Sequence, residues 1–237
     1  IEVQPIQTLA VDIGGSGIKV LVLDAAGNPL TERDRLPTPQ PATPDAMIAI
    51  VTQLAQNQLA QNKTFDRVSV GFPGVVRAGV IETAANLDPS WIGVNLATTL
   101  THYLDRPVRV ANDADIQGLG AVLGYGVELM VTLGTGFGSA LFLNGKLVPN
   151  LELGHHPFRK GDTYEEQLGR AALDAIGKKR WNQRLLKAIP LLSHAFNYDF
   201  LYLGGGNTKK IEVELPPNVK IIPNITGLLG GIALWRD

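Results

Sequence analysis

The stretch QTLAVDIGGSGIKVLVLD, residues 7–24, decides the fold class of this chain. It contains two apolar, β-prone runs, 7–13 and 18–24, which flank the glycine turn GGSG at 14–17. Two such runs around a glycine turn predict a β-hairpin. The pattern returns in ELMVTLGTGFGSALFL, residues 128–143, where GTGFG joins two further apolar runs. The repetition predicts two related domains.

The rest of the chain alternates between strand and helix patterns. Further strands are expected at 68–71, 75–83, 108–111, 200–203 and 219–222, and helices at 45–59, 95–104, 113–123, 164–176, 178–193 and 227–235. The segment 36–44 holds four prolines and should be irregular. Strands that alternate with helices predict an α/β fold.

Composition excludes several classes of function. The 237 residues carry a net charge of -1, which makes no electrostatic case for a nucleic-acid partner. The chain has no cysteine, so it can form neither disulfides nor thiolate metal sites, and this suits a reducing cytoplasm. No apolar run is long enough to span a bilayer, so no membrane association is expected.

The first candidate site is DIGGSGIK, Asp12–Lys19. Glycines free the backbone to present N–H groups to an anion, Asp12 could hold Mg²⁺ through water, and Lys19 could add positive charge. A tight hairpin with a surface acid and base explains the motif equally well. The motif is neither a P-loop nor a dinucleotide fingerprint, because the turn joins two strands.

Two later glycine clusters extend the phosphate interpretation. GTGFG, Gly134–Gly138, combines backbone N–H groups with the hydroxyls of Thr132 and Thr135, which suits a phosphate. GGGN, Gly204–Asn207, follows a predicted strand and would allow a nucleotide or phosphate chain to approach the backbone. A hairpin turn and a flexible surface turn are the alternatives.

Acidic and polar residues gather at a predicted strand-to-helix junction in ANDAD, 111–115. An Asn–Asp pair suits a sugar, since the amide both donates and accepts and the carboxylate can take a hydroxyl proton. Asp113 or Asp115 could instead cap the helix. Farther along, Glu152 and His155 lie three residues apart in LELGHH and could face one polyol, ligate a metal or belong to an ordinary polar loop.

A run of basic residues carries no acid among its members. It consists of Lys178, Lys179, Arg180, Arg184 and Lys187, with Lys209 and Lys210 farther on. A solvated helix face is the usual explanation for such a run. In a nearly neutral protein the clustering could also line a track for a polyanion.

Taken in order, the motifs resemble the ROK family of sugar kinases and repressors, within the actin-like ATPase superfamily, and most of all its bacterial polyphosphate-dependent glucokinase branch. The resemblance covers nearly the whole chain. It rests on LAVDIGGSGIK, VGFPGVV, TAANLDPSWIGVNL, VANDAD, VTLGTGFGSAL, ELGHHPF, TYEEQLGRAALDAIGKKRW and LYLGGGN.

This resemblance implies an actin-like (ribonuclease H-like) α/β fold of two domains with an interdomain cleft. The expected N-terminal domain is 1–111, joined by a C-terminal helix at 227–237, and the expected C-terminal domain is 112–226. A homodimer is expected on the same ground. Most ROK proteins carry a cysteine-rich zinc motif after the Gly-His pair; its absence here predicts no zinc.

The resemblance also implies residue roles. Asp113 matches the catalytic base. Asn112, Glu152, His155 and Glu165 match sugar-binding positions, with Asn86 and Gly74 lining the same pocket, and Glu166 is the alternative to Glu165. The first phosphate loop corresponds to Asp12, Gly14, Gly15, Ser16, Gly17 and Lys19, the second to Gly134, Thr135 and Gly136, and the nucleotide or distal phosphate region to Gly204, Gly205, Gly206 and Asn207.

The implied activity is phosphoryl transfer from inorganic polyphosphate, with ATP as a further donor, to the 6-hydroxyl of glucose, assisted by Mg²⁺. Three alternatives stay open. The first is an ATP-dependent kinase for mannose, fructose or an N-acetyl hexosamine. The second is a non-catalytic sugar-sensing regulator, although no DNA-binding segment is found. The third is an actin-like assembly protein, against which the Glu152–His155 motif argues.

Overall fold

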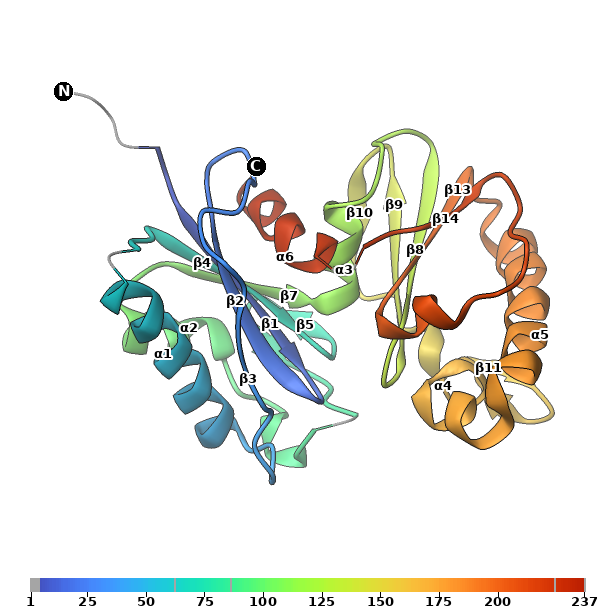
Figure 1. Cartoon of the computed structure of the whole chain (residues 1–237), viewed down its shortest axis with the longest axis horizontal. Helices are drawn as coiled ribbons and strands as arrows, with labels where there is room; N and C mark the ends of the chain where they lie inside the picture. The colour runs from blue at the N-terminus through green and yellow to red at the C-terminus, as the bar shows by residue number, and fades with distance from the viewer. Residues whose placement is uncertain (1–4, 62, 86, 224, 237) are drawn as a thin grey trace. The chain divides into compact units, whose positions relative to one another are not determined.

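A computed structural model describes residues 5–61, 63–85, 87–223 and 225–236 (Figure 1). The chain divides into two units. Unit 1 comprises the chain up to Gly120 together with the residues from Gly227 onward, and unit 2 is Ala121–Thr226. Unit 1 therefore includes helix α3, Asp113–Leu119, which packs on the strands of that unit. The N-terminal domain expected from the sequence instead ends at residue 111.

Unit 1 is built on a five-stranded sheet with the order β3-β2-β1-β4-β7. Neighbours β1/β2 and β2/β3 are antiparallel, whereas β1/β4 and β4/β7 are parallel. The elements are β1 Thr8–Gly14, β2 Gly17–Leu23, β3 Asp34–Leu36, α1 Pro44–Ala60, β4 Arg67–Phe72, β5 Val76–Arg77, β6 Val80–Ile81, η1 Pro89–Trp91, α2 Leu96–Leu104, β7 Val108–Asn112, α3 Asp113–Leu119, α6 Thr226–Leu229 and η4 Gly230–Trp235.

Both faces of the unit 1 sheet are covered, which explains why its strands read as continuous apolar runs. Alternate residues of β1 and β2 belong to different cores. Leu9 and Val11 pack in the core that α1 and α2 cover, whereas Ala10 and Leu21 pack against the C-terminal segment. Figure 1 shows α1 and α2 together on one side of this sheet.

The C-terminal segment is fastened to β4 by a chain of hydrogen bonds. Ser69 Oγ donates to the Gly231 carbonyl at 2.7 Å and accepts from Trp235 Nε1 at 2.8 Å. The guanidinium groups of Arg67 and Arg109 lie 4.9 and 4.6 Å from the Trp235 ring centroid. Cation–π contacts therefore reinforce the attachment.

Unit 2 repeats the sheet of unit 1. Its order, β10-β9-β8-β13-β14, has the same sequence of two antiparallel and two parallel pairings. The prediction of two related domains is thus confirmed by topology. The elements are β8 Val127–Leu133, β9 Phe137–Leu143, β10 Lys146–Val148, η2 Leu153–His155, β11 Pro157–Arg159, β12 Asp162–Thr163, α4 Tyr164–Leu168, α5 Arg170–Phe196, β13 Phe200–Gly204, η3 Gly206–Lys210 and β14 Val219–Ile221.

Helix α5 is the main cover of the unit 2 sheet. Its buried Trp181 and Leu185 pack in one core with Leu129 of β8 and Leu201 of β13. The helix is kinked at Gly177, which has φ 75° and ψ 162°. The predicted division between helices at 164–176 and 178–193 falls at this kink, and a further break at Gly169 separates the short α4 from α5.

Two predicted elements differ from the structure. The strand expected at 75–83 is the small hairpin β5–β6, which turns at Ala78 and Gly79 with φ of 47° and 81°. The helix expected at 227–235 is largely the 3₁₀ segment η4. A Cβ on Gly230 would lie 1.8 Å from the Ile116 carbonyl oxygen, so the close approach to α3 fixes this path.

Candidate functional site

The turn between β1 and β2 places the first candidate residues. Strand register sets Asp12 opposite Lys19, and Lys19 Nζ lies 2.7 Å from Asp12 Oδ2. Their side chains are 28% and 29% exposed, so the ion pair is accessible to a ligand. Gly15 and Ser16 are exposed at the tip of the turn. The structure thus brings a carboxylate, an ammonium and a glycine turn together.

A residue that the sequence analysis missed lies at this turn. Arg35 Nη2 donates to the Ser16 carbonyl oxygen at 2.9 Å. A Cβ on Gly17 would lie 2.4 Å from Arg35 Nε, so the absence of a side chain at Gly17 makes room for the guanidinium. The only sequence signal would have been the three-residue strand β3, which pairs Arg35 with Lys19.

The Asn–Asp pair lies where β7 meets α3. Asn112 caps the helix: its Oδ1 accepts from the Ala114 N–H at 2.8 Å, and its Nδ2 donates to the Gly74 carbonyl at 3.0 Å. The amide therefore joins VANDAD to the Phe-Pro-Gly loop. A Cβ on Gly74 would lie 2.0 Å from the Thr83 carbonyl oxygen, so this loop requires glycine there.

Asp113 is the first residue of α3 and is partly exposed, whereas Asp115 is buried at 6% exposure. Asp113 Oδ1 accepts from the Ala114 N–H at 2.7 Å. The positive end of the helix stabilises a carboxylate in this position. Of the two acids in the motif, Asp113 is the one that a ligand can reach more readily.

In unit 2, the structure brings Glu152, His155 and Glu165 together. His155 Nε2 lies 3.7 Å from Glu152 Oε2. Burial raises the pKa of Glu152; the nearby His155 lowers this pKa and the Glu165 carboxylate raises it. Glu165 Oε2 accepts from the Phe137 N–H at 3.1 Å, at the end of the GTGFG turn. Two carboxylates and an imidazole thus adjoin the second glycine turn.

The neighbouring Glu166 has a different task. Its Oε2 accepts from the Thr163 N–H at 2.8 Å while its own N–H donates to Thr163 Oγ1 at 3.2 Å, which is a capping box at the start of α4. These hydrogen bonds lower the pKa of Glu166. Of the two candidates, only Glu165 interacts with Glu152.

The turn GGGN packs against the second glycine turn. Asn207 Nδ2 donates to the Gly134 carbonyl at 2.8 Å, and Asn207 is only 5% exposed. Gly205 has φ 86°, and a Cβ there would lie 2.4 Å from the Leu133 carbonyl oxygen. Asn207 therefore anchors the loop, and its assignment to the nucleotide or distal phosphate region stays a prediction.

Open space remains beside two other glycines. No atom lies within 4 Å of a Cβ placed on Gly134 or on Gly206. A ligand can therefore approach the backbone closely at these two positions. Thr135 is exposed, and its carbonyl accepts from the Arg170 N–H at 3.1 Å, which joins the turn to the start of α5.

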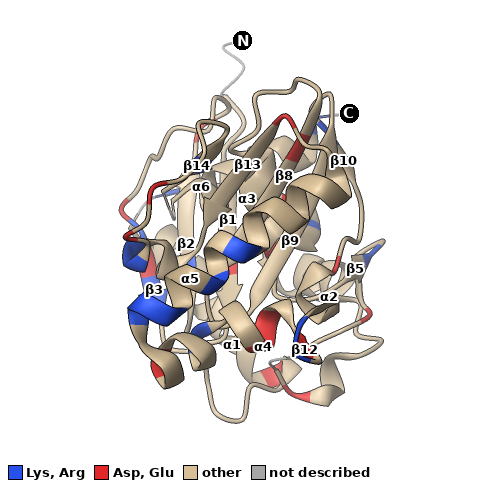
Figure 2. Cartoon of the chain, turned by 90° about the vertical axis from the view of Figure 1, so that its right-hand side faces the viewer, with Lys and Arg blue, Asp and Glu red and all other residues tan. Residues whose placement is uncertain are grey.

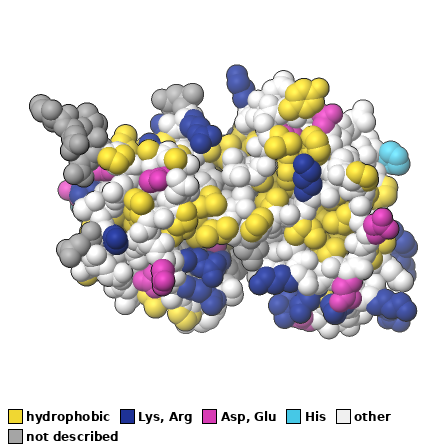
Figure 3. Space-filling model, turned by 45° about the horizontal axis from the view of Figure 1, so that its top comes forward, with side chains coloured by type: hydrophobic (Ala, Val, Ile, Leu, Met, Phe, Trp, Pro, Cys, Tyr) yellow, Lys and Arg dark blue, Asp and Glu magenta, His cyan; other side chains and the backbone are white. Residues whose placement is uncertain are grey.

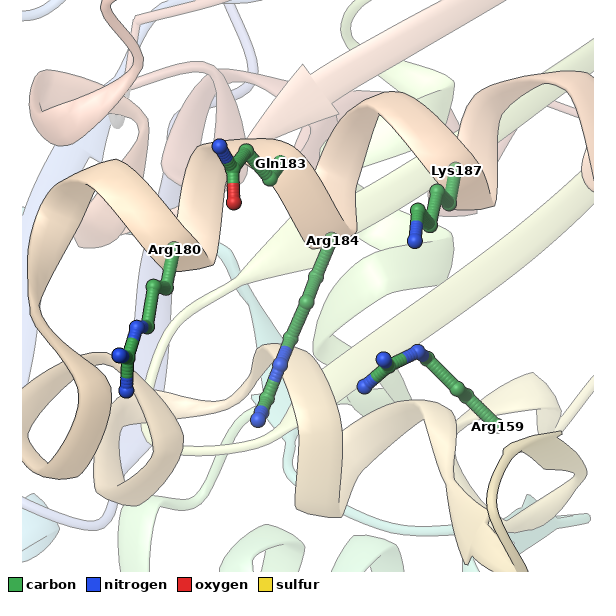
Figure 4. A pocket seen from close by; sticks show the side chains of 5 residues that line it. All are labelled: Arg159, Arg180, Gln183, Arg184 and Lys187. Atoms are coloured by element: carbon green, nitrogen blue, oxygen red, sulfur yellow. The ribbon is translucent and has the colours of Figure 1, made fainter.

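The basic residues predicted on α5 point in different directions around the helix. Lys178 Nζ pairs with Glu212 on one side of the helix. Arg180, Arg184 and Lys187 line a cavity of about 240 Å³ together with Gln183 and with Arg159 of β11 (Figure 4). Figure 2 shows the basic positions of α5 in blue and the acidic first turn of α4 in red.

Three further observations concern Asn86, metal ligands and membrane-spanning helices. The predicted residue Asn86 lies outside the described residues. Within the described ranges, no group of three or more His, Asp or Glu side chains is arranged to hold a metal ion. Across those same ranges, every helix is too short or too polar to cross a bilayer.

Comparison with known proteins shows what the chain as a whole is similar to. The family model described as "ROK family" matches residues 8–165. Polyphosphate glucokinase of Mycobacterium tuberculosis is 34% identical over 93% of this chain and 88% of its own length. The polyphosphate glucokinase of Mycobacterium leprae is 33% identical over 93% of this chain and 72% of its own length.

A solved structure shows the same fold. The inorganic polyphosphate/ATP-glucomannokinase of Arthrobacter sp. strain KM superposes with a TM-score of 0.89 at 35% identity, covering 98% of this chain and 100% of that chain. The actin-like ATPase fold with two α/β units is therefore established here. With a family model that matches more than half of its residues, the chain belongs to the ROK family.

Proposed function

We propose that this protein is a polyphosphate-dependent glucokinase, which transfers a phosphoryl group from inorganic polyphosphate to the 6-hydroxyl of glucose. The observation that carries the proposal is the match to polyphosphate glucokinases over 93% of the chain. The side chains agree with the proposal. Asp113 is partly exposed, and Glu152, His155 and Glu165 form a polar cluster beside the second glycine turn.

Asp113 is proposed as the general base. Its carboxylate would accept a hydrogen bond from the 6-hydroxyl and take the proton as the oxygen attacks phosphorus. General-base assistance contributes about 10²–10⁴-fold in rate. Positioning and charge stabilisation supply the remainder, because phosphoryl transfer passes through a loose transition state.

We assign Asn112, Glu152, His155 and Glu165 to the hydroxyl groups of the sugar. Asn112 keeps one N–H and one lone pair beyond its bonds to Gly74 and Ala114. Polar groups that match hydroxyls reject analogues that lack them, because buried partners would be left unpaired.

The donor phosphates would lie against the glycine turns. Gly134 and Gly206 leave space for close approach, and Lys19 and Arg35 supply positive charge at the first turn. Mg²⁺, when bound with the donor, would neutralise phosphate oxygens. A single accessible carboxylate fits Mg²⁺, which is usually held by one or two carboxylates and by the phosphates themselves; Asp12 is that carboxylate.

Two finer properties belong to the same proposal. ATP is proposed as an alternative donor and mannose as a second acceptor, which the polyphosphate/ATP-glucomannokinase of Arthrobacter supports. A cytoplasmic homodimer is proposed as the functional form. Leu123, Tyr125 and Leu143 of unit 2 are exposed, which agrees with a protein partner. Figure 3 shows apolar side chains on one face of the molecule.

A kinase assay tests the proposal directly. Purified protein is incubated with glucose and Mg²⁺ and with either long-chain polyphosphate or ATP, and glucose 6-phosphate is measured. Mannose, fructose and N-acetylglucosamine replace glucose in parallel reactions. Formation of glucose 6-phosphate from polyphosphate is expected. Activity with ATP alone would replace the proposal by an ATP-dependent hexokinase, and no transfer with any pair would favour a sugar-sensing regulator.

A further inference from the structure

The basic cavity of unit 2 has no part in the chemistry proposed above. It is lined by Arg159, Arg180, Gln183, Arg184 and Lys187 and has a volume of about 240 Å³. Figure 4 shows the three α5 cations extending from one side of the helix toward the level of Arg159, which comes from β11. Among the described residues that line the cavity none is acidic, although the protein as a whole is nearly neutral.

The spacing of these cations suits an extended ligand. Arg180, Arg184 and Lys187 follow the i, i+4, i+7 pattern that places residues on one face of a helix. Seven residues of helix rise by about 10 Å. Cations spread over that length offer several successive contacts to a linear polyanion, more than a single phosphate needs.

Electrostatics within the cavity favours an anion. Burial lowers the pKa of Arg184, and the charges of Arg159 and Arg180 lower it further, against the opposing effect of Asp162. The Asp162 carboxylate itself accepts from Gln167 Nε2. By contrast, Lys178, two residues before Arg180, pairs with the carboxylate of Glu212. The cavity cations therefore repel one another, and an anion between them relieves that repulsion.

Helix α5 connects the cavity to the second glycine turn. The Arg170 N–H, at the start of α5, donates to the Thr135 carbonyl. Ten residues separate Arg170 from Arg180 along α5, and the helix bends between them at the non-helical Gly177. A polyanion whose reacting end lies at the glycine turn would have to be several phosphates long to reach the cavity.

We propose that this cavity is a secondary site that holds the distal part of a polyphosphate chain while its terminal phosphoryl group reacts at the glycine turns. The inference rests on the proposed function. It assigns Arg159, Arg180, Arg184 and Lys187 to binding of an extended phosphate polyanion and gives them no role with ATP.

The test compares two double variants of equal charge change. In R180A/K187A, two cavity cations are removed, while Arg184 keeps its bond to the Gln167 carbonyl. The matched control is K63A/K146A, which removes two exposed lysines elsewhere. The KM for long-chain polyphosphate is expected to rise about tenfold or more in the cavity variant, because charge-assisted hydrogen bonds are lost. The KM values for tripolyphosphate and for ATP should stay within about twofold of wild type in both variants.

Direct binding separates this inference from the proposed function. Binding of long-chain polyphosphate is measured by calorimetry without glucose, with inorganic phosphate and single-stranded DNA as competitors. Weaker binding by R180A/K187A alone supports the site even if the wild type transfers phosphate only from ATP. An equal loss in the control, no loss in either variant, or equal competition by inorganic phosphate or DNA would overturn it.

Discussion

Asn207 Nδ2 and the Gly134 carbonyl oxygen are joined by a hydrogen bond of 2.8 Å, which ties the GGGN turn to the GTGFG turn. Asn207→Ala leaves that partly buried carbonyl without this donor, which destabilises the arrangement by about 1–3 kcal/mol. We expect the second glycine turn to lose its position and kcat/KM for either phosphoryl donor to fall about tenfold or more. Steady-state kinetics with polyphosphate and ATP measures the effect.

The control for that variant is Asn218→Ala. Asn218 Nδ2 also donates to a backbone carbonyl, that of Asp199, at 3.2 Å, but at an exposed position. Its loss should leave donor kinetics near wild type. Equal kinetics in the two variants would show that the bond from Asn207 to Gly134 does not position the donor.

Asp113→Asn tests the general base. The substitution keeps the shape of the side chain and removes its ability to take a proton, so kcat should fall about 10²–10⁴-fold while glucose still binds. Glucose binding is measured by calorimetry and turnover by glucose 6-phosphate formation. Asp45→Asn, an acid in the first turn of α1, is the matched control for the lost interaction with a helix N-terminus.

Glu152 and Glu166 should respond to pH with opposite signs. Burial raises the pKa of Glu152 above 4.5, so the folded state binds this proton more tightly and stability falls as pH rises through the interval between the unfolded and folded values. Glu152→Gln should therefore raise Tm more at pH 7 than at pH 4. Thermal unfolding across this range measures the difference, and the same variant should raise the KM for glucose.

Hydrogen bonds to Thr163 lower the pKa of Glu166, so its stabilising contribution is present above pH 4.5 and is lost as pH falls through its folded value. Glu166→Gln should lower Tm at pH 7, and the deficit should vanish in acid. The KM of the Glu166→Gln variant for glucose should equal that of wild type. A raised KM in Glu166→Gln alone would exchange the roles assigned to Glu165 and Glu166.

Alanine substitutions at two adjacent glycines should have different effects, one on stability and the other on donor binding. Gly205 has φ 86° and lies against Leu133, so Gly205→Ala should destabilise unit 2 by about 1–3 kcal/mol. Gly206 faces open space, so Gly206→Ala should keep Tm near wild type. Its methyl group should raise the KM for the donor, since it occupies the space that the phosphates would enter. Unchanged donor kinetics in Gly206→Ala would place the phosphates elsewhere.

Elements that depend on residues close together in the chain could be predicted from the sequence. The hairpins β1–β2 and β8–β9 follow from apolar runs that meet at a glycine turn, and the helix α1 from its apolar spacing. The small hairpin β5–β6 was mistaken for one strand, because its turn depends on a positive φ at Ala78 as well as at Gly79.

The candidate site likewise contains residues that sequence spacing predicts and residues that it does not. Glu152 and His155 could be paired from their spacing, whereas Arg35 reaches the first glycine turn because β3 pairs with β2, a pairing that was not predicted. The anchoring role of Asn207 depends on two turns that are seventy-three residues apart in the chain. Sequence spacing contains no signal for such a contact.

The attachment of the C-terminal segment to β4 has a consequence for biosynthesis. Ala10 and Leu21 remain uncovered until Leu228 and Ile232 have left the ribosome. Unit 2 is contiguous in the chain and can mature earlier, whereas unit 1 has to wait with half of its sheet open. During translation the nascent protein therefore exposes apolar side chains of β1 and β2, a kind of surface that chaperones bind. The sheet of unit 1 is covered on this face only after the C-terminal segment has been made.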